Sequence, residues 1–168
     1  IGNGYIPRIA EEISYIDVPQ GDIPNVQVDG WRSESSEGIE ITDEMRISFH
    51  SMSLPTARLV WHCPFAVIYT SSDGQVGGNN YRELTVIRLD GEGWEEDDHA
   101  ENYGLVNKLD SFTNWNDFKE QNKAGQDCEL LFRVKKGQID ISTEFCGLSI
   151  HSVTTITDEV PKLFAALT

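Results

Sequence analysis

Residues 89–104, LDGEGWEEDDHAENYG, concentrate the side chains of this chain that are best suited to acid–base or metal chemistry. If a strand reaches Asp90, its carboxylate and that of Glu92 point the same way and lie about 6.6 Å apart along an extended backbone. This separation falls within the roughly 6.5–9.5 Å that divides the two carboxyl groups of an inverting glycosidase. Gly91 and Gly93 predict, however, that the chain turns there, whereas a catalytic acid requires a rigid and desolvated position. The pair therefore permits a glycoside hydrolase or lyase without favouring one.

The same stretch could instead bind a cation through the consecutive acids at positions 95–98, with His99 beside them. Calcium sites need oxygen ligands at alternating positions and a glycine at the bend, whereas consecutive side chains point in different directions. We therefore expect residues 92–101 to form a solvated acidic loop that adds solubility, with no built metal site and no cofactor; adventitious cation binding stays open. Trp94 in this loop is expected either to fold back onto the domain or to act as a stacking platform.

A third group of candidate residues follows from strand parity. The alternation of Met45, Ile47 and Phe49 places these side chains in the core and directs the side chains between them to the opposite face. The same rule applied to ARLVWH, QIDISTEF and GLSIHS predicts one polar sheet face. The residues expected to bind a ligand there are Arg58, His62, Glu144, His50 and His151, with Tyr81 or Trp94 as a stacking partner. We interpret this face as a shallow groove in which no residue performs chemistry; the alternative is a solvated face with cross-strand ion pairs.

Short alternating segments separated by Gly, Asp and Asn turns predict the elements that position these residues. Roughly nine to eleven strands are expected by this pattern, most of them after residue 44, including MRISFH, ARLVWH, FAVIYT, YRELTVIRLD, GLSIHSVTTI and KLFAALT. One helix is expected in NWNDFKEQNKAG, with Asn114 as its cap, Trp115 and Phe118 on one face and Gly125 at its end. The expected fold class is mainly β, a two-sheet antiparallel β-sandwich of the jelly-roll type with one or two short helices.

Turn residues predict how these strands are connected. DCELLFRVKKGQIDISTEF is expected to be a hairpin that turns at Lys136 and Gly137, and SSDGQVGGNN, residues 71–80, is expected to be a second hairpin connection. Loop 71–80 enters the strand YRELTVIRLD and the acidic stretch leaves it, so the two lie at opposite ends of the sandwich, roughly 30 Å apart. Residues 1–44 are expected to form an irregular acidic segment, in which GYIPRIAEEISYI is a candidate helix and NVQVDGW a candidate strand.

Length and charge limit the domain organisation and the possible partners. The chain has 168 residues, which fits one domain over residues 1–168. Its 13 basic and 28 acidic residues give a formal net charge of −15, so neither nucleic-acid binding nor membrane insertion is expected. Cys63, Cys128 and Cys146 predict buried free thiols and a cytoplasmic location, or an extracellular one if the parent protein is secreted. The missing initial methionine and the apolar ending LFAALT indicate a piece of a longer protein with attached domains.

The runs RISFHSMSLPTARLVWHCPFAVIYTSSDGQVGGNNYRELTVIRLDGEGWE and NKAGQDCELLFRVKKGQIDISTEFCGLSIHSVTTI resemble an uncharacterised β-rich module attached to bacterial signalling proteins, including those with cyclic-dinucleotide turnover domains. In its jelly-roll layout the chain is also similar to concanavalin-type carbohydrate-binding modules. These resemblances imply an accessory sensing or binding role, with any enzyme activity elsewhere in the full-length protein. They carry over no site residues.

Three functions follow as hypotheses. The leading one is a non-catalytic ligand-binding or sensory accessory module whose ligand is a glycan or another small polar molecule. The alternative is a glycoside hydrolase or lyase that uses paired carboxylates, and the second alternative is a structural or dimerisation domain. A groove lined by aromatic and polar groups supports the first, two converging carboxylates in a deep cleft support the second, and a flat, apolar, exposed sheet supports the third.

Overall fold

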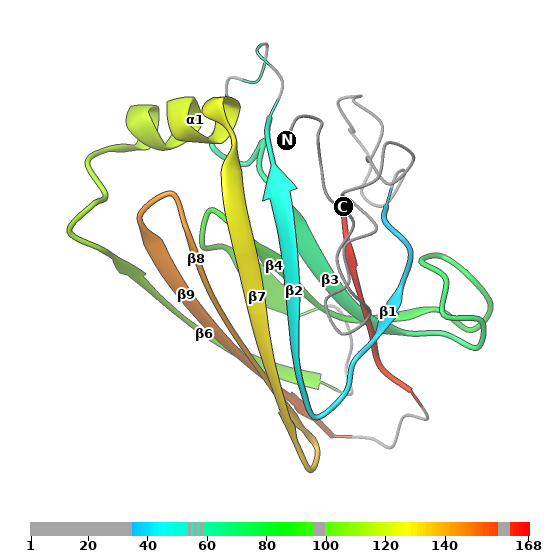
Figure 1. Cartoon of the computed structure of the whole chain (residues 1–168). Coiled ribbons are helices and arrows are strands. Elements are labelled where there is room, and N and C mark those ends of the chain that lie inside the picture. Colours follow the sequence, from blue (N-terminus) through cyan, green and yellow to red (C-terminus); the bar gives the residue numbers. More distant parts are fainter. Residues whose placement is uncertain (1–34, 54, 56, 58, 96–99, 158–161) are drawn as a thin grey trace.

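The computed structural model describes residues 35–157 and 162–168, apart from 54, 56, 58 and 96–99; for residues 93–95 it describes the backbone alone. Two antiparallel five-stranded sheets pack face to face with one helix at an end of the sandwich (Figure 1). The predicted two-sheet β-sandwich is therefore confirmed, and its ten described strands fall within the expected range. The candidate N-terminal helix, the strand NVQVDGW and the side chain of Arg58 lie outside the described residues.

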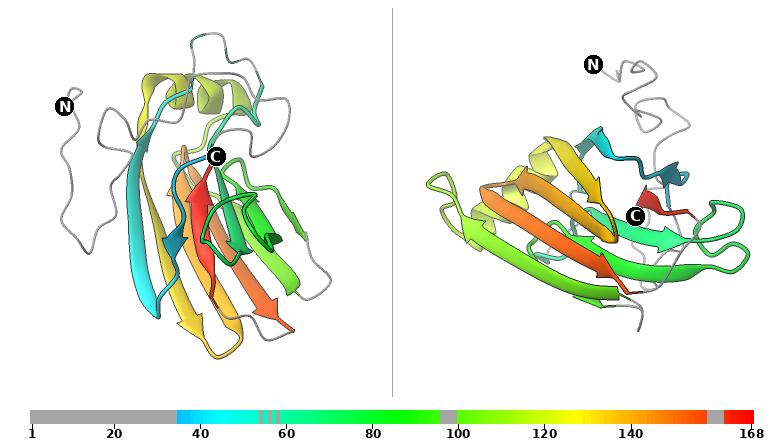
Figure 2. Two further views of the ribbon diagram at one scale, coloured as in Figure 1. Left: turned by 90° about the vertical axis from the view of Figure 1, so that its right-hand side faces the viewer. Right: turned by 90° about the horizontal axis from the view of Figure 1, so that it is seen from below.

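The strands of each sheet come from distant parts of the sequence. Sheet A has the order β2-β7-β8-β9-β6, made of β2 (Glu44–Ser51), β7 (Gln126–Lys135), β8 (Gln138–Phe145), β9 (Leu148–Ile156) and β6 (Ala100–Lys108). Sheet B has the order β1-β10-β3-β4-β5, made of β1 (Ile39–Glu40), β10 (Phe164–Leu167), β3 (Phe65–Thr70), β4 (Arg82–Arg88) and β5 (Gly93–Glu95). Figure 2 shows the two sheets from the side and from below.

Four strands of sheet A, β2, β7, β8 and β9, follow the alternation that their sequence predicts. Ile47 and Phe49 of β2 are buried, while Arg46 is exposed and His50 is half-buried. The same period of two runs along β7, β8 and β9, and their inner side chains form the main core with the inner side chains of sheet B. The predicted hairpin is also present, because β7 ends at Lys135, β8 begins at Gln138, and Gly137 takes the positive φ of 72° that its tight turn requires.

Sheet B buries apolar side chains on both faces, which explains why β3 reads FAVIYT without polar alternation. Val67, Tyr69 and Val86 form a second apolar cluster on the face turned away from sheet A. The loop between β3 and β4 packs against that cluster through Val76 and Tyr81. Tyr81 therefore has a structural role, since its ring lies 5.2 Å from that of Tyr69.

Helix α1 (Trp115–Ala124) closes one end of the sandwich on the path from β6 to β7. The Asn114 side chain accepts a hydrogen bond from the backbone N–H of Asp117, and Gly125 ends the helix with a φ of 102°, both as predicted. Phe118 anchors the helix because it is 1% exposed and its ring packs edge-on against Phe145 at a centroid distance of 5.7 Å.

Two sequence predictions about strands were wrong. ARLVWH is not a strand in its described part, because residues 59–61 form a turn in which the N–H of His62 donates to the carbonyl of Leu59. Trp61, expected in the core, is 50% exposed. The acidic stretch, expected to be one loop over residues 92–101, contains β5 and the start of β6. β6 escaped prediction because its side chains are mostly exposed on both faces, which removes the alternation of apolar residues.

The sheets are joined at one end of β6. The Asn102 side chain donates to the carbonyl of Leu84 in sheet B over 3.2 Å and accepts from the hydroxyl of Thr154 in sheet A. Toward the other end of β6 the side chains of Val106 and Lys108 are exposed, although they point to the same side of the strand as Asn102. The sheets are therefore held together at the start of β6 and separate toward its end.

Cysteine chemistry has little support in this fold. Cys63, Cys128 and Cys146 are free thiols; Cys128 and Cys146 are buried as predicted, whereas Cys63 is half-buried. Burial raises the pKa of all three thiols, to about 12 for Cys146, and the nearby charge of Asp90 raises the pKa of Cys63 further. A thiol with a raised pKa is protonated at neutral pH and is a poor nucleophile.

Candidate functional site

The residues predicted to form one ligand surface do not come together. His50, Glu144 and His151 share the outer face of sheet A, on β2, β8 and β9. His62 lies in the connection between β2 and β3, where its carbonyl accepts a hydrogen bond from the Asn122 side chain of α1. The expectation that His62 belongs to a strand face with Glu144 was therefore wrong, because the strand that would carry it does not form.

The two candidate stacking partners also lie away from Glu144. Tyr81 packs on the outer face of sheet B, and its hydroxyl donates to the Glu83 carboxylate over 2.6 Å. Trp94 belongs to β5, whose backbone pairs with β4 so that Trp94 lies opposite Val86. Ligand binding by any of these residues stays a prediction.

Cross-strand ion pairs occupy much of the outer face of sheet A. His50 Nδ1 lies 2.8 Å from the Asp127 carboxylate, and His151 contacts the Asp140 carboxylate through Nε2. Arg46 faces Glu129 at 3.6 Å, and Arg133 faces Glu44 at 3.8 Å. Most of these side chains are widely exposed, so each pair contributes little stability. These cross-strand contacts fit the alternative interpretation of the outer face of sheet A, a solvated sheet surface.

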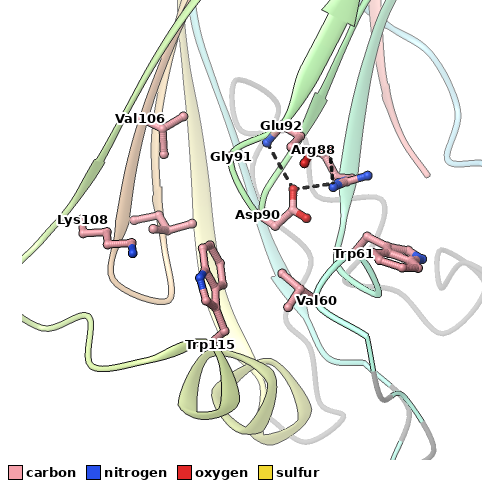
Figure 3. A pocket seen from close by; sticks show the side chains of 10 residues that line it. Val60, Trp61, Arg88, Asp90, Gly91, Glu92, Val106, Lys108 and Trp115 are labelled. Carbon is pink, nitrogen blue, oxygen red and sulfur yellow. Dashed lines mark hydrogen bonds and ion pairs between the residues drawn. The ribbon is translucent and has the colours of Figure 1, made fainter.

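A cleft of about 370 Å³ lies instead between the two sheets, on the side of α1 (Figure 3). Val106 and Lys108 of β6 line one side, the turn from β4 to β5 lines the other, and Trp115 of α1 lies between them. The lining residues are Val60, Trp61, Arg88, Asp90, Gly91, Glu92, Val106, Lys108, Trp115 and Leu148. The cleft opens where the sheets separate along β6, so the fold itself creates it.

Arg88 organises the polar side of the cleft. Its Nε lies 2.7 Å from Asp90 Oδ1, and its Nη2 lies 2.6 Å from Glu92 Oε2. Asp90 Oδ1 also accepts the backbone N–H of Glu92. The side chains of Arg88 and Asp90 are 14% and 4% exposed, whereas that of Glu92 is 68% exposed. One guanidinium thus holds a buried and a solvated carboxylate in a fixed position at the cleft.

Burial of the Arg88 guanidinium acts to lower its pKa, but the hydrogen bond to Asp90 and the charges of Asp90 and Glu92 outweigh burial and raise it. Arg88 is therefore permanently charged, and its interaction with Asp90 is a charge-assisted hydrogen bond in a partly dry environment. The backbone supports this geometry, because the chain turns between Arg88 and Glu92 with Gly91 at a φ of 99°. A Cβ at Gly91 would lie 2.9 Å from Val106, so glycine also allows the turn to approach β6.

The apolar side of the cleft is built around Trp115, which is 38% exposed. Its ring packs edge-on against the rings of Phe112 and Phe118, at centroid distances of 5.0 and 5.3 Å, and these contacts fix its position. The Lys108 ammonium lies 5.5 Å from the centre of the same ring. An aromatic surface and a cation therefore face the cleft together.

No protein-family model, curated protein or solved structure matches this chain. The resemblance to a signalling module therefore stays a prediction. Within the described residues there is no group of three or more His, Cys, Asp or Glu side chains placed to hold a metal ion. The described part of the chain also has no helix with the length and apolar character that crossing a bilayer requires.

The sequence predicts two of the cleft residues, Asp90 and Glu92, as carboxylates two positions apart with a turn at Gly91. It does not predict that the Arg88 guanidinium connects them. Arg88 has the same parity as both acids, so the pattern R-x-D-x-E was a readable signal for a shared ion pair. Val106, Lys108 and Trp115 carried no such signal, because the crossing from β6 through α1 to β7 brings them to the cleft.

Proposed function

We propose that this domain is a non-catalytic binding module that holds a saccharide, or another small polar ligand of similar size, in the cleft between its sheets. The observation that supports this most directly is the combination of Trp115 with the fixed charged groups Arg88, Asp90 and Glu92 in one cleft. Ligand sites of proteins are typically clefts of about 300–1,000 Å³ with apolar walls and a few convergent polar groups. A sugar presents both an apolar ring face and hydroxyl groups, so it matches an aromatic surface beside hydrogen-bonding side chains.

The paired carboxylates favour binding over hydrolysis. Glycosidases place their two carboxyl groups on opposite sides of the bond they cleave, and one of them must act as an acid. Asp90 and Glu92 instead share one guanidinium on a single turn, on the same side of the cleft. Their remaining oxygen lone pairs are suited to accept hydrogen bonds from ligand hydroxyl groups. In the full-length protein such a module would recruit or sense its ligand for attached domains.

Replacing Trp115 by alanine is expected to weaken binding by about 10- to 30-fold, because truncating a buried aromatic contact at a binding site costs about 1.4–2 kcal/mol or more. The measurement is a calorimetric titration with neutral and uronic-acid oligosaccharides. Lys108→Ala is expected to reduce binding of the uronic-acid series more than that of the neutral series.

Leu131→Ala is the matched control, since it removes an apolar side chain that is 43% exposed on the outer face of sheet A, away from the cleft. Its affinity should equal that of the wild type. If Glu144→Ala or His151→Ala abolishes binding while Trp115→Ala preserves it, the ligand surface is the outer sheet face and the proposal for the cleft is wrong.

A further inference from the structure

The second half of β6 forms an open sheet edge. β6 lies at the border of sheet A, where its described partner is β9 (Figure 2). Every residue from 103 to 108 is exposed, including Tyr103 at 66%, Leu105 at 46% and Val106 at 39%. Among the described residues no strand pairs with the other edge of this segment, so a row of backbone N–H and C=O groups faces outward there.

The other sheet edges carry the features that normally prevent pairing between molecules. β1 and β5 have two and three residues, which is too short to offer a ladder of hydrogen bonds. β2 is long, but its outward side chains include the charged residues Glu44 and Arg46. Residues 102–107 of β6 have no charge, no proline and, among the backbone angles of the described residues, no positive φ. This edge therefore lacks the usual protection against strand addition.

We propose that residues 101–107 of β6 pair in antiparallel fashion with the same residues of a second copy of this chain, joining two copies of sheet A into one continuous sheet. In a two-fold symmetric pair of this kind, residues that lie directly opposite each other point to the same face of the joined sheet. Outer residues therefore pair with outer residues, and the two-fold axis passes through a residue and not between two residues. With the axis at Gly104, Tyr103 of each copy faces Leu105 of the other. Glu101 then faces Asn107, and no like charges meet along the strand.

A second copy fits this edge because the two-fold register pairs the edge with itself without placing like charges opposite each other. Each chain carries a net charge of −15, so its surfaces repel one another, yet residues 102–108 contain no acid and include Lys108. The paired strands can therefore approach without local repulsion between carboxylates. Added salt screens the long-range repulsion of the two acidic chains and should strengthen the dimer.

The test is sedimentation of the whole chain over a concentration series, at low and high salt, with hydrogen exchange of the β6 amides in parallel. The wild type is expected to dimerise, more tightly at high salt, and the amides at 101–107 should exchange more slowly as concentration rises. Leu105→Glu should raise the dimer dissociation constant by about tenfold or more. Leu131→Glu makes the same change on an exposed leucine of β7, an interior strand of sheet A, and should leave dimerisation unchanged.

A charge pair tests the register. The double variant Tyr103→Lys with Leu105→Glu should dimerise again, because lysine of each copy then faces glutamate of the other, whereas Tyr103→Glu with Leu105→Glu should stay monomeric. Circular dichroism and thermal unfolding confirm that each variant keeps the fold. A wild-type chain that stays monomeric at its highest soluble concentration, or dimerisation that is lost on Leu131→Glu and kept on Leu105→Glu, overturns the proposal.

Discussion

Replacing Phe118 by alanine is expected to destabilise the fold by about 3–5 kcal/mol, since truncation of a buried phenylalanine removes its burial and leaves a cavity. Phe118 is 1% exposed and packs against Phe145 and beneath Trp115, so it fastens α1 to the end of the sandwich. For a domain of this size, each kcal/mol lowers the melting temperature by about 2–4 °C. Thermal unfolding followed by circular dichroism should therefore show a melting temperature lowered by about 6–20 °C.

Two further variants separate cavity formation from changes in the helix itself. Phe118→Leu keeps most of the side-chain volume and should lose clearly less stability than alanine. Asn116 is exposed on α1. Its replacement by alanine should leave the stability unchanged or raise it slightly, because alanine is the better helix former. A Phe118→Ala protein that melts within about 2 °C of the wild type would show that α1 does not stabilise the sandwich.

Replacing Arg88 by methionine is expected to lower the free energy of unfolding by a similar amount, about 3–5 kcal/mol, because it leaves the buried Asp90 carboxylate without its partner charge. Asp90 is 4% exposed on its side chain, so water cannot take the place of the guanidinium. Chemical denaturation at neutral pH is the measurement. The fold should remain, but the midpoint should fall sharply.

The double variant Arg88→Met with Asp90→Asn should recover much of this loss, since it removes the unpaired charge as well. Glu92→Gln serves as the matched control: Glu92 bonds to the same guanidinium but is 68% exposed, so its removal should cost less than about 1 kcal/mol. If the single and double variants are equally unstable, Arg88 contributes through packing on Phe65, whose ring centre lies 5.8 Å from its guanidinium carbon, and not through its charge.

The strands of the sandwich could be predicted where one face of the strand is exposed to solvent and the other is buried in the core. β2, β7, β8 and β9 alternate with period two, and the α1 cap at Asn114 and the Lys136-Gly137 turn use residues with strong local preferences. The period-two prediction was wrong for Trp61. Although ARLVWH alternates apolar and polar residues, its described part forms a turn, in which the N–H of His62 donates to the carbonyl of Leu59 and the Asn122 side chain donates to the carbonyl of His62. The period-two prediction failed again for β6, which is exposed on both faces.

The site was less predictable, because it depends on which strands are neighbours. Parity correctly placed His50, Glu144 and His151 on one face, yet it could not show that both histidines contact aspartates of neighbouring strands there. The cleft joins Arg88 of sheet B, Lys108 of sheet A and Trp115 of α1. No local pattern in the sequence relates these three residues, since their proximity is a property of the topology.

β10 is an interior strand of sheet B, between β1 and β3, although it comes last in sequence among the described strands. β1 and β3 both pair with β10 and, among the described residues, not with each other. During synthesis the meander of β7, β8 and β9 can pair as soon as residue 156 has left the ribosome, whereas the edge of β3 stays open until Phe164–Leu167 emerge. Sheet A is thus available as a template before sheet B can close, and Phe164–Leu167 complete the hydrogen bonding between β1, β10 and β3.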